Sequence, residues 1–120
     1  MNALRIVAAA ALVVSGLSMS GAAQGQQVTG TLMDVMCSTE HASDANFTTN
    51  HDKKCLLMDG CVKSGYSLIT SDRKVLKFDA KGNQLALDLI KKTDREKNWT
   101  VAVTGAVTGE TIAVTDIKMR

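Results

Sequence analysis

The sequence predicts a mostly β domain of five strands and two helices, with the sheet closed into a barrel. Three observations lead to this prediction. Apolar and β-branched residues alternate over several short segments, pairs of these segments are separated by gaps of hairpin length, and one longer segment has helical spacing. Closure would hide the strand edges that an open five-stranded sheet exposes. A two-layer α+β sandwich is the alternative architecture.

The first half of the domain is expected to contain one strand and one short helix. Residues 28–36 alternate in polarity and are rich in β-branched side chains, with Gly30 at a bulge or bend. Residues 38–50 are rich in Ser, Thr, Asn and Asp, which bond to their own backbone, so a loop is expected there. A helix is expected to begin at His51 with Asn50 as its N-cap.

The second half is expected to contain two hairpins separated by a helix. Residues 66–70 and 74–78 are short apolar runs joined by a turn-like gap. Residues 83–92 carry apolar side chains at helical spacing and end in two lysines, which the helix dipole favours. Residues 99–105 and 111–117 alternate in polarity and are expected to form the last two strands.

This element order is the plan of the small oligonucleotide/oligosaccharide-binding (OB) barrel. The Cys-containing loop and helix after the first strand form an insertion into that plan. The chain has no proline, repeat or low-complexity tract, so residues 24–120 are expected to form a single OB-like domain. The residues expected in its apolar core are Val28, Leu32, Leu68, Ile69, Leu76, Phe78, Leu85, Leu89, Val101, Val103, Ile112, Val114 and Ile117.

Residues 1–23 have the three parts of a secretory signal peptide. A positive charge at Arg5 precedes an apolar run over residues 6–17, and small and polar residues follow. The run is shorter than the about 20 residues that a membrane-spanning helix needs. We therefore expect cleavage after Ala23 and a periplasmic or secreted protein that does not insert stably into the membrane.

The charge and the aromatic content disfavour a nucleic-acid partner. The formal net charge is +2, too small to neutralise a row of phosphates. One Trp, one Tyr and two Phe are too few for a platform on which bases stack.

The residues with metal-binding or redox chemistry lie between positions 37 and 61. Cysteine thiolate and neutral histidine are the ligands of structural zinc, and four residues of these types offer a four-coordinate site for zinc or another soft metal. Their spacing matches no recognised ribbon or finger pattern, and Asp34 is placed to orient a ligand. The four residues are Cys37, His51, Cys55 and Cys61.

A disulfide is the preferred interpretation of the same cysteines, because an exported chain meets an oxidising compartment. Three cysteines allow three single pairings with one free thiol. An unbroken helix from Cys55 to Cys61 would separate their Cα atoms by about 9 Å, beyond bridging distance. The expected bridge therefore joins Cys37 to Cys55 or Cys61, and closing a loop of about 20 residues would contribute about 3 kcal/mol.

Catalysis is not predicted. The chain has no C-x-x-C pair for thiol exchange, and no oxyanion donor is identifiable near His51 and Cys55. Met33, Met36 and Met58 have thioethers that suit soft metals, but methionine is commonest as core filler, and a core role is expected for all three.

Five segments of the chain carry a resemblance to known proteins. They are Val28-Thr29-Gly30 with Asp34 and Cys37, Cys61-Val62-Lys63-Ser64-Gly65, Val75-Leu76-Lys77-Phe78, Val101-Ala102-Val103-Thr104-Gly105 and Thr111-Ile112-Ala113-Val114. In these segments, which span nearly all of the mature chain, it resembles a family of small exported bacterial proteins with an OB-like barrel and no assigned substrate. The resemblance implies the fold and the compartment. The family often has a C-x3-C pair where this chain separates Cys55 and Cys61 by five residues.

Together these observations predict an exported, non-enzymatic binding or interaction module of the cell envelope. It would be stapled by a disulfide, carry no cofactor and recognise an unidentified envelope ligand or protein. One alternative is a protein that binds zinc or another soft metal through its Cys/His cluster. The other is a purely structural protein without a ligand.

Overall fold

The computed structural model describes residues 25–120, and the predicted signal peptide lies outside this range. Helix and strand contents are about equal, and the described residues form five helices, so the prediction of a mostly β domain with two helices is wrong. The elements are β1 (Gln26–Asp34), α2 (Val35–His41), α3 (Ala45–Asn50), α4 (Lys53–Leu56), α5 (Asp59–Ser64), β2 (Tyr66–Ile69), β3 (Val75–Phe78), α6 (Ala80–Lys92), β4 (Thr100–Thr108) and β5 (Thr111–Met119).

The five predicted strands are present and form one sheet that closes on itself in the order β1-β2-β3-β5-β4. All neighbours are antiparallel except β3 and β5, which run parallel, with Phe78 opposite Ile112. The register shifts between Thr104 and Gly105, whose partners in β5 are Asp116 and Val114, so the extra residue is Thr115 of β5 and the irregularity does not lie at Gly30. A Cβ at Gly30 would clash with the backbone of β2, which explains the glycine by close approach.

The core fills the closed sheet and the space beneath α6. All but three of the expected core residues are buried, and the three exceptions, Val28, Leu85 and Leu89, are partly buried against it. Trp99 was not expected in the core, yet it is completely buried, and its indole N–H donates to the Glu96 carbonyl at 3.2 Å. That bond supplies the partner a buried indole needs.

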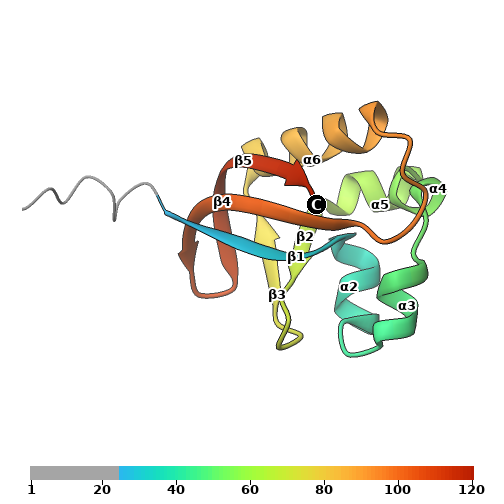
Figure 1. Ribbon diagram of the computed structural model, residues 1–120, viewed down its shortest axis with the longest axis horizontal. Coiled ribbons are helices and arrows are strands. Elements are labelled where there is room, and N and C mark those ends of the chain that lie inside the picture. The colour runs from blue at the N-terminus through green and yellow to red at the C-terminus, as the bar shows by residue number, and fades with distance from the viewer. Residues whose placement is uncertain (1–24) are drawn as a thin grey trace, which may run out of the picture.

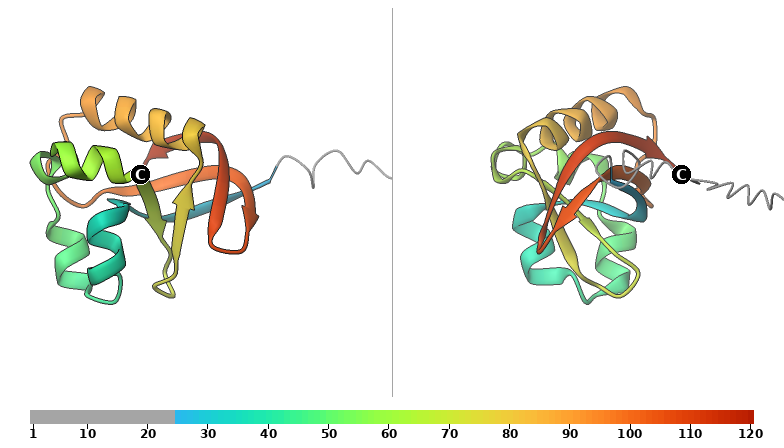
Figure 2. Two further views of the ribbon diagram at one scale, coloured as in Figure 1. Left: turned by 180° about the vertical axis from the view of Figure 1, so that it is seen from behind. Right: turned by 90° about the vertical axis from the view of Figure 1, so that its left-hand side faces the viewer.

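Helix α6 lies over β5 on the outside of the sheet (Figure 1; Figure 2). Asp79 caps it, accepting from the Gly82 amide at 2.9 Å and from the Val114 amide at 3.2 Å, so the helix begins three residues before the predicted start. It buries Ala86 and Ile90. None of the described helices is long and apolar enough to cross a membrane.

Helices α2 to α5 gather at one end of the sheet, and the β4–β5 turn lies at the other end (Figure 1; Figure 2). We call residues 35–64 the insertion. Its first part is helical, not the expected loop, because Asp34 and Asp44 cap α2 and α3. The Ser and Thr side chains bond to carbonyls three or four residues back, as Ser38 and Thr39 do to Val35, which helical backbone allows.

Candidate metal centre

Asp34 is the residue around which the site is built. It ends β1 and caps α2, and its side chain is completely buried. One carboxylate oxygen accepts from the Cys37 amide at 2.9 Å, and the other lies 2.8 Å from His51 Nε2. Burial raises the pKa of the carboxyl, but the bonds from His51 and Cys37 outweigh it and lower the pKa. Asp34 is therefore a buried carboxylate.

His51 reaches Asp34 from the end of α3, where it is the C-cap residue. It is 6% exposed, and its ring stacks on Phe47 with centroids 5.4 Å apart. Because the carboxylate accepts only, Nε2 carries the proton of this hydrogen bond. The bond fixes the orientation of the imidazole ring beside the carboxylate.

Cys37 completes a cluster of three metal-ligating residues. The candidate ligand atoms of Asp34, Cys37 and His51 all lie within 4.8 Å of one another. Burial, followed by the nearby Asp34 carboxylate, raises the pKa of the Cys37 thiol to about 12. A metal ion at this point would replace that proton and offset the negative charge.

The other two cysteines are not members of this cluster, and they differ in the groups that they interact with. Cys61, which is 5% exposed on α5, adjoins Cys37 and Asp34, and the pKa of its thiol is raised by burial and then by Asp34. The pKa of Cys55 is raised mainly by a hydrogen bond with Asp52, which also caps α4 by accepting from the Cys55 amide at 2.8 Å. Of these two cysteines, Cys61 is therefore the better candidate for a fourth ligand.

All three cysteines are free in the structure. The predicted bridge from Cys37 to Cys55 or Cys61 stays a prediction. The argument against joining Cys55 to Cys61 assumed one unbroken helix, whereas α4 ends at Leu56 and α5 begins at Asp59. The N-cap of the helix that contains Cys55 is Asp52, not the expected Asn50.

Cys37 and His51 of the cluster line an open pocket of about 370 Å³, and Asp34 lies behind them, outside the lining. Two of the three methionines expected in the core line it instead: Met36 is 52% exposed and Met58 is 56% exposed, whereas Met33 is completely buried. The pocket is thus accessible from solvent and its lining is mostly apolar and sulfur-containing. Its lining residues are Met36, Cys37, Phe47, Asn50, His51, Asp52, Cys55, Met58 and Cys61.

Two histidines flank the same aromatic ring but differ in position. His41 stacks on Phe47 with centroids 3.7 Å apart and lies 3.8 Å from Glu40, at the half-exposed end of α2. It is not a member of the cluster, although it is four residues from Cys37 on one helix. His51 and Cys55 lie on either side of a helix boundary, so their spacing of four does not place them on one helical face.

Buried hydroxyl groups support the backbone behind the cluster. Ser67 of β2 donates to the Met33 carbonyl at 3.1 Å and lies 3.0 Å from the Ser38 hydroxyl. Ser38 in turn donates to the Val35 carbonyl at 3.0 Å. These bonds join α2 to β1 and β2 on both sides of Asp34, which limits the movement of the site.

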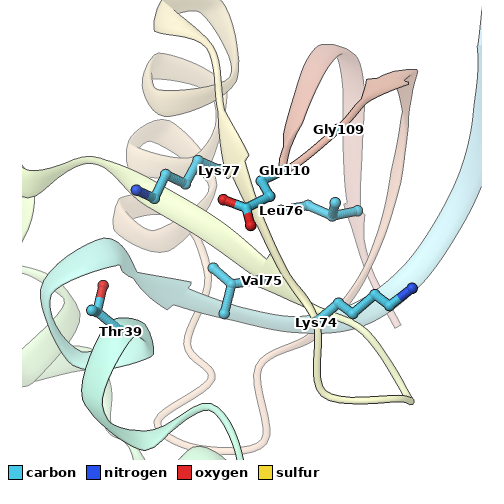
Figure 3. A pocket seen from close by; sticks show the side chains of 7 residues that line it. All are labelled: Thr39, Lys74, Val75, Leu76, Lys77, Gly109 and Glu110. Carbon is cyan, nitrogen blue, oxygen red and sulfur yellow. The ribbon is translucent and has the colours of Figure 1, made fainter.

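A larger cavity of about 600 Å³ lies beside β3 and the β4–β5 turn. Its polar lining side chains are exposed, and Lys74 pairs with Asp72 at 3.7 Å. Figure 3 shows the side chains of Lys74 and Lys77 extending to opposite sides, with the Glu110 carboxylate between them. No buried polar group converges there, so it is the weaker candidate for a specific site.

Comparisons with family models, with curated proteins and with solved structures find no match to this chain. Sequence reasoning identified Cys37 and His51 and gave Asp34 an orienting role, but it did not place Asp34 at the centre. The signal for that role was a lone acidic residue at the junction of a strand and a Cys-containing segment.

Proposed function

We propose that the protein is an exported, non-enzymatic binding module of the cell envelope whose ligand is a soft metal ion. Asp34, Cys37 and His51 would hold the ion, with Cys61 as the fourth donor. The observation that carries the proposal is the convergence of a carboxylate, a thiol and an imidazole within 4.8 Å. Asp34 and Cys37 lie three residues apart at the start of α2, His51 comes from the end of α3, and Cys37 and His51 line an open pocket.

The chemistry of this donor set favours zinc or a softer ion over calcium and magnesium, because thiolate and imidazole bind the former and hard oxygen ligands the latter. Two ligand atoms on a tetrahedral zinc ion are about 3.3 Å apart. Asp34 Oδ1 and His51 Nε2 are 2.8 Å apart, which is a hydrogen-bond distance. An increase of about 0.5 Å in this distance would therefore let an ion replace the proton that the two atoms share.

We also assign the domain an OB-like topology. The closure of the sheet through parallel β3 and β5, with α6 between β3 and β4, supports this assignment. In OB-type domains the loop between the first two strands contributes to ligand binding. The insertion occupies that place in the chain, so the assignment agrees with a binding role for the pocket.

Titration of the reduced protein with Zn²⁺ tests the proposal, with native mass spectrometry and alkylation of the thiols as readouts. We expect one ion per chain and protection of Cys37 and Cys61 from alkylation. Replacing Cys37 by Ser should weaken zinc binding by at least about tenfold, because a ligand is lost.

Cys55→Ser is the matched control, because Cys55 lines the same pocket but interacts with Asp52. Its zinc affinity should stay close to that of the unmodified protein. The absence of a one-to-one complex would contradict the proposed function. An equal loss of affinity in both variants would contradict the donor set.

A disulfide between Cys37 and Cys61 is the second candidate for this site, because each of the two thiols affects the pKa of the other. In that case the protein is a disulfide-stapled binding module with Cys55 free. Its intact mass without reductant would be lower than the reduced mass by two hydrogen atoms, and only one thiol would be alkylated. Reduction would then lower the free energy of unfolding by about 3 kcal/mol.

A further inference from the structure

The pocket beside the cluster contains an unusual concentration of sulfur. Five of its nine lining residues are cysteine or methionine, although the whole chain has three and six of these residues. Three of the five are the thiols described above. The other two are the thioethers of Met36 and Met58.

The exposure of these two methionines is not explained by packing. Burying a methionine side chain contributes about 1.5–3 kcal/mol, yet Met36 and Met58 are 52% and 56% exposed. In the part of the chain that the structure describes, Val107 is the third exposed large hydrophobic side chain, and it lies in β4. Single exposed apolar side chains are ordinary, but two thioethers at one pocket that also contains three thiols are not.

The two methionines reach the pocket from different helices. Met36 is in α2, next to Cys37, and its amide donates to Ser64 of α5 at 3.2 Å. Its terminal methyl lies 3.4 Å from the position that a Cβ would take at Gly60, the residue before Cys61. Met58 is the N-cap residue of α5. Both side chains are unbranched and therefore adaptable enough to turn their sulfur toward the pocket.

Thioether sulfur discriminates between metals more sharply than thiolate does. Thiolates bind zinc and copper(I) alike, whereas methionine is a ligand of copper(I) and not of zinc. Asp34, Cys37 and His51 alone therefore suit either metal, and the methionines are the part of the pocket that separates the two.

We propose that the pocket binds a monovalent soft cation, copper(I), and that Met36 and Met58 bind this ion at the mouth of the pocket. This inference rests on the metal-binding function proposed above. An ion that enters from solvent would then meet sulfur ligands along its whole path, first the thioethers of Met36 and Met58 and then the thiols of Cys37 and Cys61. No change of oxidation state is involved, because the ion enters and stays as copper(I).

Competition with a chromophoric copper(I) chelator under anaerobic, reducing conditions tests this, with silver(I) as a redox-stable second probe. The test variant replaces Met36 and Met58 by Leu, which keeps their volume and removes the sulfur. We expect its copper(I) and silver(I) dissociation constants to rise by at least about tenfold. Its zinc affinity and its thermal midpoint without metal should not change.

Met119→Leu is the matched control, because Met119 packs against the core and does not line the pocket. If the unmodified protein binds zinc and copper(I) but the Met36/Met58 variant keeps its copper(I) affinity, the copper(I) inference is overturned and the proposed function stands. If the variant loses affinity for zinc and for copper(I) equally, the methionines act through packing and the inference is likewise overturned. If the unmodified protein binds neither metal, the proposed function itself fails.

Discussion

The β4–β5 hairpin buries only apolar side chains, whereas the insertion buries hydroxyl groups and an imidazole against a buried carboxylate. In the hairpin, Val101, Val103, Ile112 and Val114 are at most 1% exposed. The five buried polar or charged residues lie in the insertion or contact it. They are Asp34, Ser38, Thr48, His51 and Ser67.

The comparison shows two ways of stabilising one small domain. Helices shorter than about 12 residues are marginal by themselves in water, and each helix of the insertion has four to seven residues. Aspartate side chains cap α2, α3 and α4, and buried hydrogen bonds from His51 to Asp34 and from Ser67 to Ser38 join the insertion to the sheet. A metal ion or a disulfide at the cluster would add a cross-link where apolar burial is least.

The largest effect is expected from the apolar side of the comparison. Trp99→Ala removes a completely buried side chain at the start of β4 and should lower the free energy of unfolding by about 3–5 kcal/mol. Urea denaturation followed by circular dichroism measures it. Val107→Ala, an exposed position in β4, is the control and should change the value by about 0.5 kcal/mol. Equal effects would show that the hairpin does not depend on its core.

The orientation of α6 gives the next effect. Ile90→Ala should cost about 2–5 kcal/mol, because Ile90 is completely buried, and Leu89→Ala should cost less, because Leu89 is only partly buried. The same denaturation experiment compares the two variants. A larger loss for Leu89→Ala would mean that the helix turns its other face to β5.

The junction between the two regions gives a smaller effect. The Tyr66 hydroxyl on β2 donates to the Leu56 carbonyl on α4 at 2.7 Å, so Tyr66→Phe should cost about 1–3 kcal/mol at neutral pH. Burial, then Asp34, raises the pKa of Tyr66 to about 12 from an ordinary value of 10.

Because this pKa is raised on folding, Tyr66 contributes its full stability below pH 10 and loses it as the pH rises toward 12. The difference in unfolding free energy between the unmodified protein and Tyr66→Phe should therefore shrink over that interval. A difference that grows with pH would show that the hydroxyl ionises more readily in the folded state.

The regular part of the fold was predictable from sequence because its strands are short apolar or alternating runs separated by turn residues. The last two strands, which contain Val101, Val103, Ile112 and Val114, show this most clearly. The insertion was not predictable in the same way. Whether Ser38 and Thr39 break a helix or bond within it depends on the Asp34 cap, and that cap has no periodic signal.

The site was predictable in its residue types but not in its arrangement. The alternative metal-site interpretation placed Cys37 and His51 together, whereas it did not anticipate the break between α4 and α5 or the local hydrogen bond of Cys55 with its cap residue Asp52. The exposure of Met36 and Met58 is likewise a property of the folded surface.

The most direct test of the central claim, a soft-metal site at the insertion, is X-ray absorption spectroscopy of the one-to-one zinc complex of the reduced protein. We predict a mixed shell, with sulfur from Cys37 and Cys61 at about 2.3 Å and nitrogen or oxygen from His51 and Asp34 at about 2.0–2.2 Å. A shell of nitrogen and oxygen alone would contradict the claim.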